Sequence, residues 1–545
     1  MKKIFNLILL GMIVIGTSSC KKYLDINTNP NTSTVGPVDL VLPQAITATA
    51  ALSNTYSNSL GNIAGATANI FGVGGYGAYL NYNYVTADFN GLWTTGYDVA
   101  NDYNYVISQT EASSSLVYST SMARIGKAFV MSKLVDQFND IPYSEAFQGQ
   151  ANLAPKYDDA LTIYKDLVAQ LNTAITAITT GQAANVATPG SVVVPNVNAD
   201  PLFRNDMNAW KRFANTLKLR LLIKIATSNK DAAFATAQFA SFDNTIGIIT
   251  DDAVVNPGYI KDPGRQNPTY DSWGYSVAGV RANAQRIPTN WILAFYNGNK
   301  LNDTKRGSVI FRNFPTPAVN QLGNENTTSS QVPPTGVHPA TGQSLSSSSW
   351  FTGTVAGGDA LGFIKGATQG QPIMLLAEAR FLQAEAYQRG YLTGTASTSF
   401  DEGIKASIRY LYKSAGGVVD GSVDTDAELT AELTAYKAAN ASATAAPLVN
   451  LTPGREIEAI ITQKYIALLY ITSDEAFNEY RRTAFPTTVN NSLVATASFA
   501  SRLSNSTRTD RLPARLPYPS SEFTTNAGNI PSVNIFTSLI FWDLD

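Results

Sequence analysis

The sequence contains few of the side chains that catalyse reactions near neutral pH. Its 545 residues include one histidine, His338, and one cysteine, Cys20. Histidine is well suited to proton transfer at neutral pH, but catalysis and metal binding both need partners that converge on it. His338 lies in PTGVHPATG, whose glycine and proline residues predict an exposed loop. We therefore expect neither a catalytic histidine nor a zinc site, which would have to combine His338 with three carboxylates.

Carboxylates are the remaining candidates for catalysis, since the chain has 41 aspartate and glutamate residues. A glycoside hydrolase needs two of them ~5 to 9 Å apart on opposite sides of a sugar. No such pair lies in a recognisable motif, so we expect no catalytic residue and keep a hydrolase as an alternative. Four glutamates lie in expected helices near arginines, which predicts ion pairing: Glu378, Glu385, Glu475 and Glu479.

A glycine-rich segment at 72–77, GVGGYG, matches the spacing G-x-G-x-x-G, and Asp98 follows about twenty residues later. A dinucleotide site needs a buried strand before this motif and a helix after it. The flanking segments GATANI and AYLNYNY favour neither. The glycines instead predict a loop that bends and exposes Tyr76 and Tyr79.

Two acidic segments resemble calcium loops only in part. DINTNPN begins with Asp25 and has asparagines two and four residues later, but Pro30 and Gly36 occupy the positions that need glycine and glutamate. The cluster at 420–428, DGSVDTDAE, lacks the required spacing. We expect solvated turns at both segments, and neither a metal nor a cofactor.

The N-terminus predicts export and a lipid anchor. A basic start at Lys2 and Lys3 precedes an apolar run at 4–15, which is shorter than the ~20 residues of a membrane span. Small residues then lead to Cys20, as in a bacterial lipoprotein signal, where this cysteine is acylated. We expect a signal peptide at residues 1–19, with Cys20 as the lipidation site. A plain exported protein with an incidental cysteine is the alternative.

The composition favours a neutral polar ligand. The 39 basic and 41 acidic residues give a formal net charge of −2, so no basic surface invites nucleic acid. Charged residues form 15% of the chain, below the typical ~25%. Asparagine, serine, threonine and tyrosine are abundant instead, and these side chains suit neutral hydrogen-bonding ligands better than ions.

The periodicity of apolar residues predicts a mainly α fold. After a flexible leader at 20–37, one domain is expected over 38–545, built from helical pairs with little β-structure. Two pairs resemble tetratricopeptide repeats: one contains YDDALTIY, and the other joins AEAYQRG, with a cap at Gly390, to FDEGIKASI. Such pairs bury a face only by stacking on their neighbours. Helices are expected at 38–61, 92–109, 121–138, 156–175, 204–226, 230–242, 371–390, 399–413, 454–471 and 473–482.

Residues 245–370 interrupt this pattern and predict an irregular insertion rich in glycine, proline and serine. Disordered segments contain few aromatic residues, and a structureless segment of this length in an ordered protein is often functional. The insertion carries several rings, which favours a functional role: Tyr259, Tyr270, Trp273, Tyr275, Trp350 and Phe351.

Several blocks of the sequence, in this order, resemble the SusD/RagB family of nutrient-binding outer-membrane lipoproteins. They are DQFNDIPYSEAF, WKRFANTLKLRLLIKI, LLAEARFLQAEAYQRG, EAFNEYRRTAFP and RLPARLPYPSSE, and the leader segment DINTNPN also fits. The resemblance implies a helical scaffold with tetratricopeptide-like units, whose irregular insertions form the ligand face. It also implies a SusC-like, TonB-dependent transporter as the partner, and glycan as the usual ligand, although some members handle peptides.

The residues that could bind a sugar follow from this expectation. The C–H face of a sugar stacks on an aromatic ring, while amides and carboxylates bind its hydroxyl groups. Trp93, Trp210 and Trp291 lie in helical blocks and are assigned to packing. The candidate ligand-binding residues are Tyr76, Tyr79 and Tyr82 with Asn81 and Asn83, and, on the insertion, Trp273, Tyr275 and Trp350 with Asp271.

The favoured hypothesis is a non-catalytic lipoprotein at the cell surface, anchored in the outer membrane, which binds oligosaccharides for uptake. One alternative is a tetratricopeptide-type adaptor, or a lipoprotein that binds peptides. Another is a lipid-anchored glycoside hydrolase. Binding of purified polysaccharides and peptides separates the first two hypotheses, and release of reducing ends from a polysaccharide identifies the third.

Overall fold

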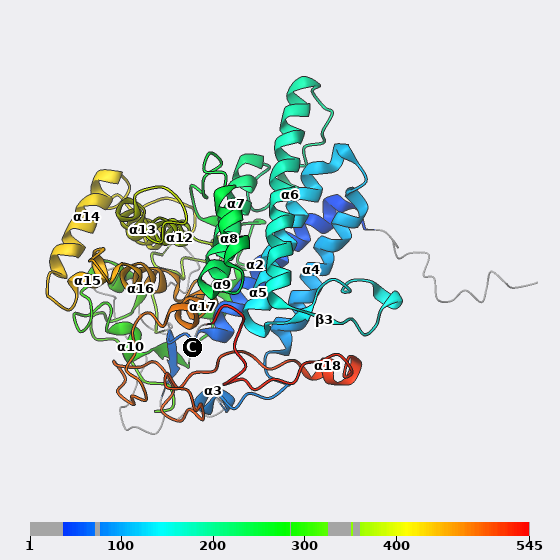
Figure 1. Ribbon diagram of the computed structural model, residues 1–545. Helices are drawn as coiled ribbons and strands as arrows, with labels where there is room; N and C mark the ends of the chain where they lie inside the picture. The colour runs from blue at the N-terminus through cyan, green and yellow to red at the C-terminus, as the bar shows by residue number, and fades with distance from the viewer. Residues whose placement is uncertain (1–35, 71–76, 284, 325–349, 353–359, 544–545) are drawn as a thin grey trace, which may run out of the picture.

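Helices form the framework of the molecule, as Figure 1 shows. The structure is a computed structural model that describes residues 36–70, 77–283, 285–324, 350–352 and 360–543. The expected mainly α fold with little β-structure is confirmed. Cys20, Tyr76, His338 and the calcium-like segment at 25–36 lie outside the described residues, apart from Gly36.

The N-terminal half is a row of helices, each packed on the next. α2 packs on α4, α4 on α5, α5 on α6, α6 on α7, and α7 on α8. α2 also contacts α17 from the C-terminal half. The bounds are α2 Val38–Leu60, α4 Asn90–Thr110, α5 Val117–Phe138, α6 Ala160–Ala187, α7 Met207–Ser228 and α8 Ala232–Ala240.

The C-terminal half adds a second group of helices, seen on the left of Figure 1. α12 packs on α13 and α16, and it also reaches α7 in the first group. Among the described helices, none is long and apolar enough to cross a membrane. The bounds are α12 Leu376–Gln388, α13 Ala396–Leu411, α14 Asp426–Ala439, α15 Ala446–Val449, α16 Glu456–Leu468 and α17 Ser473–Thr483.

Helix ends agree with the sequence at some positions and differ at others. Gly390 follows α12 with φ of 71°, as expected for a residue that ends a helix in the left-handed region. The same helix was expected to begin near Pro372, but it begins at Leu376, because Pro372 lies in strand β6 opposite Val254. The acidic cluster at 420–428 is also more than a solvated turn, since Thr425 and Glu428 form the capping box of α14.

Buried ion pairs hold helices of both groups together. The Lys224 ammonium on α7 lies 2.9 Å from Asp136 on α5 and 3.0 Å from Glu475 on α17. Arg482 on α17 lies 2.7 Å from Glu385 on α12, and both side chains are fully buried. Burial favours the neutral form of Glu385, but the Arg482 guanidinium holds its pKa at about 2.

The four glutamates in helices are therefore structural ion-pair partners, as expected, but only Glu385 and Glu479 pair with an arginine close in sequence. Glu378 binds Arg220 at 2.7 Å, and Glu475 lies 3.8 Å from the same arginine. Glu479 binds Arg482 at 2.5 Å. Each of these carboxylates is almost completely removed from water.

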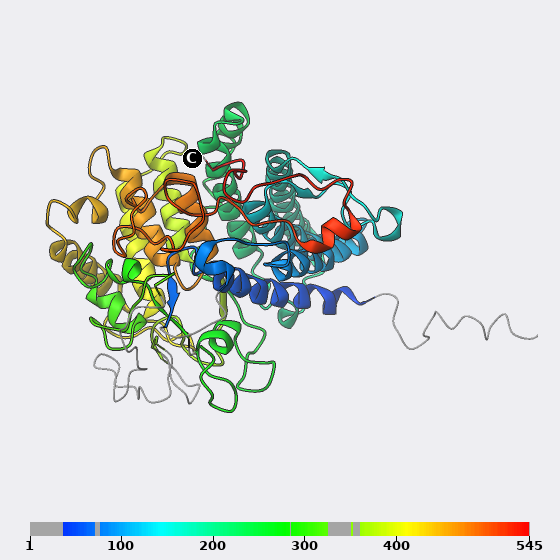
Figure 2. The same cartoon turned by 90° about the horizontal axis from the view of Figure 1, so that it is seen from below.

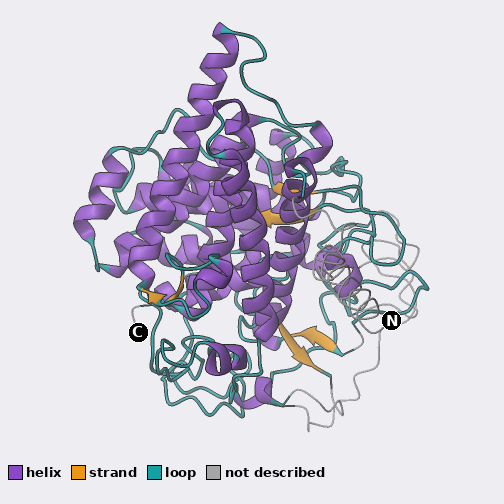
Figure 3. Ribbon diagram, turned by 90° about the vertical axis from the view of Figure 1, so that its right-hand side faces the viewer, coloured by secondary structure: helices purple, strands orange, loops and turns teal. Residues whose placement is uncertain are grey.

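Many of the loops gather at one end of the molecule, the lower end of Figures 1 and 3, which Figure 2 views directly. We call it the loop-rich end. β1 (Thr67–Asn69) pairs antiparallel with β5 (Arg286–Pro288), with Ala68 opposite Ile287. The other ribbons pair β2 (Ile141–Pro142) with β3 (Tyr157–Asp158), and β4 (Ala253–Val255) with β6 (Gln371–Met374). The remaining short elements are α3 Ala78–Asn81, η1 Ser114–Leu116, η2 Gly149–Ala151, η3 Val197–Ala199, α9 Pro268–Trp273, α10 Asn290–Leu293, α11 Thr304–Ile310 and α18 Ser520–Thr525.

The segment 245–370 contains more regular structure than the sequence predicted. Its described part includes the short helices α9, α10 and α11. A side chain caps the start of each helix: Asn267 accepts from Tyr270 N, Thr289 from Ile292 N, and Asp303 from Arg306 N. Caps of this kind stabilise helices too short to show a clear apolar period.

Candidate ligand-binding site

Tyr79 on α3 is half-buried at the loop-rich end, where α3 is labelled in Figure 1. Its ring packs edge-on against Tyr84 and Phe89, with 5.9 Å between ring centroids in each case. Tyr84 and Phe89 also contact each other at 4.8 Å. These contacts fix the orientation of the Tyr79 ring, while the residue as a whole remains partly accessible.

Arg286 lies in strand β5, near residues of both segments that the sequence analysis proposed for ligand binding. The β1–β5 ribbon brings residue 70 beside residue 285, where Ile70 N donates to Gln285 O at 2.9 Å. The Arg286 guanidinium lies 5.6 Å from the Trp273 ring centroid. Burial raises the pKa of the Tyr79 hydroxyl, and the nearby Arg286 charge opposes this effect. The Arg286 charge therefore acts on Tyr79 and also lies near the Trp273 ring, although the sequence analysis did not propose Arg286 as a binding residue.

Four nominated rings were expected to be exposed, and this expectation is wrong. Tyr82 is 0% exposed, Tyr275 is 1% exposed, and Trp273 and Trp350 are each 2% exposed. Rings that are this deeply buried cannot stack on a sugar in this conformation.

Tyr82 turns inward because it follows α3 in the left-handed backbone region, with φ of 57°. Its hydroxyl accepts a hydrogen bond from Ser501 N at 2.9 Å, which ties it to a segment more than 400 residues later. A polar tip with a buried partner allows the whole ring to be removed from water.

Trp273 is the centre of a packed aromatic cluster. Its ring centroid lies 5.2 Å from that of Phe351 and 5.6 Å from that of Phe363, both edge-on. Its indole N–H donates to the Asn58 side chain on α2. Trp273 therefore joins the 245–370 segment to helix α2 by a hydrogen bond, and it packs against other rings of the same segment.

Tyr275 and Trp350 are also structural in this conformation. Tyr275 forms a β-bridge with Arg281, and its ring lies 6.5 Å from that of Tyr270. The Trp350 carbonyl accepts from Arg312 N at 3.3 Å.

The nominated polar residues remain accessible. Asp271 is exposed, and its carboxylate accepts from the Gln266 amide at 2.9 Å. Asn81 is half-buried, and its side-chain oxygen accepts from Asn83 N at 2.9 Å. Asn83 itself is exposed. These contacts leave hydrogen-bonding capacity on each side chain.

A hollow of about 870 Å³ lies next to the Tyr79 segment, at Asn83 and Tyr84. The C-terminal segment forms most of its wall and includes Phe523, which is 49% exposed. Tyr84 lines the hollow and also contacts Tyr79, so the two features adjoin. The sequence analysis missed this wall, although Phe523 directly follows the block RLPARLPYPSSE. The lining residues are Asn83, Tyr84, Val85, Thr86, Pro517, Tyr518, Phe523, Ala527, Ile530, Pro531, Ser532, Val533, Asn534, Ile535 and Phe536.

Within the part of the chain that the structure describes, no group of three or more histidine, cysteine, aspartate or glutamate side chains is arranged to hold a metal ion. The accessible side chains among the candidate residues are the Tyr79 ring, the amides of Asn81 and Asn83, and the Asp271 carboxylate. Such a set can bind a polar ligand by stacking and hydrogen bonding.

Comparisons with known proteins agree with the sequence resemblance. The model of a family described as starch-binding and associating with the outer membrane matches residues 30–519. No curated protein matches the chain. A chitin-binding SusD homologue from Flavobacterium johnsoniae shares 19% identity at a TM-score of 0.64, over 92% of this chain and 99% of that chain. A SusD homologue from Bacteroides uniformis also shares 19% identity at a TM-score of 0.64, over 93% of this chain and 99% of that chain.

At these identities the solved structures establish a shared fold, and the family match covers most of the sequence. The blocks that carry the resemblance include the helices of the ion-pair network, namely α7, α12 and α17. The chain belongs to the SusD/RagB family.

Proposed function

We propose that this protein is a non-catalytic lipoprotein that binds oligosaccharides at the cell surface and passes them to a TonB-dependent transporter in the outer membrane. Tyr79, which is half-buried at the loop-rich end and packs against Tyr84 and Phe89, is the observation that carries the assignment of the site. The description of the family and the name of its chitin-binding member support the ligand class.

In this proposal the Tyr79 ring stacks on the C–H face of a sugar. Burial raises the pKa of its hydroxyl, so the hydroxyl stays neutral and can donate a hydrogen bond. Asn81 and Asp271 bind hydroxyl groups of neighbouring sugars, and Arg286 donates to ring or hydroxyl oxygens. The hollow beyond Tyr84 accommodates the rest of a longer chain.

Binding measurements on Tyr79→Ala test the site. Maltoheptaose, chitohexaose and a panel of soluble polysaccharides are titrated into the protein by isothermal titration calorimetry. Loss of one stacking contact is worth about 1 kcal/mol or more, so we expect affinity for the bound glycan to fall about tenfold. Tyr105→Ala is the matched control, because Tyr105 is also half-buried but lies on α4.

Equal affinity in Tyr79→Ala and in the wild type would show that the site lies elsewhere. Binding of peptides without any glycan would instead support the peptide-binding alternative. Release of reducing ends from any polysaccharide would contradict the non-catalytic assignment. The pairing of the four helix glutamates with buried cations supports that assignment, because it engages carboxylates that could otherwise act on a sugar.

The anchor and the transporter are tested together in membrane fractions of the native host. The wild-type protein is expected in the outer membrane, accessible to added protease and co-purifying with a TonB-dependent transporter. Cys20→Ala is expected in the soluble fraction, because it lacks the acylated thiol. Retention of Cys20→Ala in the membrane would exclude Cys20 as the anchor.

A further inference from the structure

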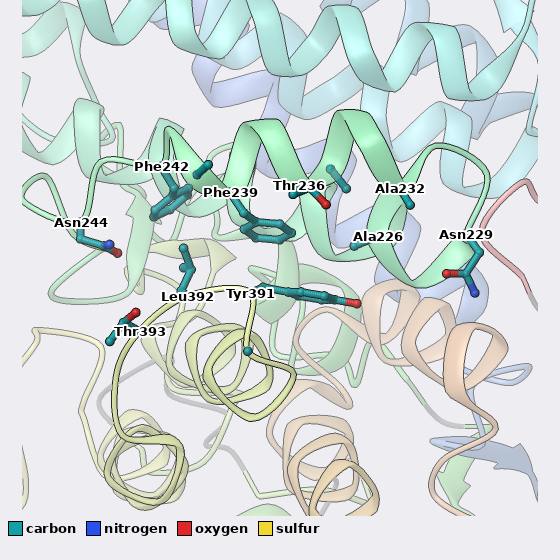
Figure 4. A pocket seen from close by; sticks show the side chains of 13 residues that line it. Ala226, Asn229, Ala232, Thr236, Phe239, Phe242, Asn244, Tyr391, Leu392 and Thr393 are labelled. Carbon is teal, nitrogen blue, oxygen red and sulfur yellow. The ribbon is translucent and has the colours of Figure 1, made fainter.

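A second hollow, of about 580 Å³, lies between α8 and the turn that follows α12, among the helical pairs (Figure 4). Its floor is the aromatic pair Phe239 and Tyr391, whose rings are stacked 4.8 Å apart with an interplanar angle of 17°. Exposed amide and hydroxyl side chains surround this pair: Asn229, Thr236, Asn244 and Thr393.

One wall of this hollow is α8 with the turn that precedes it, and the other is the turn after α12. The helical framework therefore positions both walls. Gly390 ends α12 in the left-handed region, and Tyr391 N then donates back to Ala386 O at 2.9 Å. On the facing wall, Asn229 ends α7 with φ of 56°, and the Asp231 side chain caps α8. The Tyr391 ring is thereby held beneath α8, as Figure 4 shows.

The surroundings favour a neutral ligand. A smaller hollow of about 410 Å³ shares Asn229 and Tyr391 with the first one, and Arg389 and Arg482 line it. Both guanidinium groups are already paired with Glu385, at 2.8 Å for Arg389 and 2.7 Å for Arg482. An anionic ligand would have to compete with that buried carboxylate for either cation.

We propose that the hollow at Tyr391 is a second binding site for a neutral oligosaccharide, separate from the surface at Tyr79. The hollow is lined by the aromatic side chains of Phe239 and Tyr391, by small apolar residues, and by neutral amides and hydroxyls, and no charged residue from the described part of the chain lines it. Its volume lies within the ~300–1,000 Å³ of small-molecule sites. The inference rests on the proposed function for the ligand class only, since the two sites share no residue.

Counting bound sugars on single variants tests the second site. Full-length mature protein is titrated with maltoheptaose and chitohexaose, and occupancy is measured by native mass spectrometry and calorimetry. The wild type is expected to bind two molecules of the recognised sugar. Tyr391→Ala and Thr236→Trp should each bind one molecule. Tyr391→Ala removes one of the two aromatic rings of the floor, and Thr236→Trp places a large side chain in the hollow from the exposed face of α8. Tyr79→Ala should also bind one, and the double variant none.

The outcomes separate this inference from the proposed function. One sugar on the wild type, unaffected by Tyr391→Ala and Thr236→Trp but lost in Tyr79→Ala, overturns the second site alone. One sugar lost only in the Tyr391 and Thr236 variants overturns the assignment to Tyr79 and keeps the site at Tyr391. Binding of peptides from a casein digest at this hollow, without any sugar, overturns the oligosaccharide assignment. No bound sugar overturns both proposals. Far-ultraviolet circular dichroism and the Tyr105→Ala control exclude loss of folding as the cause.

Discussion

At the residue scale, several ionisable groups of the interior neutralise one another in ion pairs. Arg482 shows this most clearly, because its guanidinium bonds Glu385 through two nitrogens at 2.8 and 2.7 Å and also reaches Glu479. A buried pair of this kind adds little over a well-packed apolar core, but removal of one partner leaves an uncompensated charge.

Arg482→Met should therefore destabilise the protein strongly. The substitution leaves Glu385 and Glu479 with one cation fewer in a buried site, and we expect the free energy of unfolding to fall by about 3–5 kcal/mol. Urea unfolding followed by circular dichroism measures this change. Arg389→Met is the matched control, since Arg389 also binds Glu385 but its side chain is 28% exposed, and its loss should cost at most about 1 kcal/mol. Equal effects of the two substitutions would contradict this account.

At the scale of elements, glycines set how closely helices approach each other. Gly403 on α13 faces the ring of Phe381 on α12, and a Cβ atom at this position would lie 2.6 Å from that ring. Gly91 on α4 has no atom within 4 Å of the equivalent position among the described residues. The same residue type is thus required by packing in one helix and not in the other.

Gly403→Ala should lower the free energy of unfolding, and Gly91→Ala should not. Overpacking costs about 1–3 kcal/mol, which exceeds the gain of up to about 1 kcal/mol that alanine gives over glycine in a helix. At Gly91 only the gain applies, so stability should rise by a few tenths of a kcal/mol or more. Thermal unfolding of both variants under one condition measures the difference. A stabilising Gly403→Ala would show that α12 and α13 can separate at no cost.

At the scale of the whole molecule, the C-terminal segment packs against helices of both groups. Trp542 is 0% exposed, and its indole N–H donates to Asp136 on α5 at 3.0 Å. The Lys224 ammonium lies 5.2 Å from its ring centroid, and the Arg481 guanidinium lies 5.0 Å from it. One ring near the end of the chain therefore covers cations from α7 and α17.

Trp542→Ala should reduce the stability of the whole molecule. It leaves a large cavity beside buried charges, and we expect a loss of about 3–5 kcal/mol in the free energy of unfolding, without a separate early transition. Phe523→Ala is the control, because Phe523 lies in the same C-terminal segment but is 49% exposed, and it should change stability by at most about 0.5 kcal/mol. Unfolding monitored by both tryptophan fluorescence and circular dichroism tests this. Two separate transitions would show that the C-terminal segment unfolds on its own.

The sequence by itself determined the elements that depend on near neighbours. Apolar residues at helical spacing marked α2, α4 to α7, α13, α16 and α17, because a helix buries one face whatever it packs against. Arg389 close to Glu385 and Arg482 close to Glu479 indicated ion pairs, and Gly390 indicated the end of α12. Each of these signals lies within a few residues of the feature that it predicts.

Only the tertiary structure decided which aromatic rings face solvent. Tyr79 and Tyr82 are three residues apart in one glycine- and tyrosine-rich segment, yet only Tyr79 remains accessible, because Ser501 binds the hydroxyl of Tyr82. Trp273 is buried by Phe351 and Phe363, which lie 78 and 90 residues later (351 − 273 and 363 − 273). Exposure of a ring is a property of the distant residues that cover it, and the local sequence does not record which residues those are.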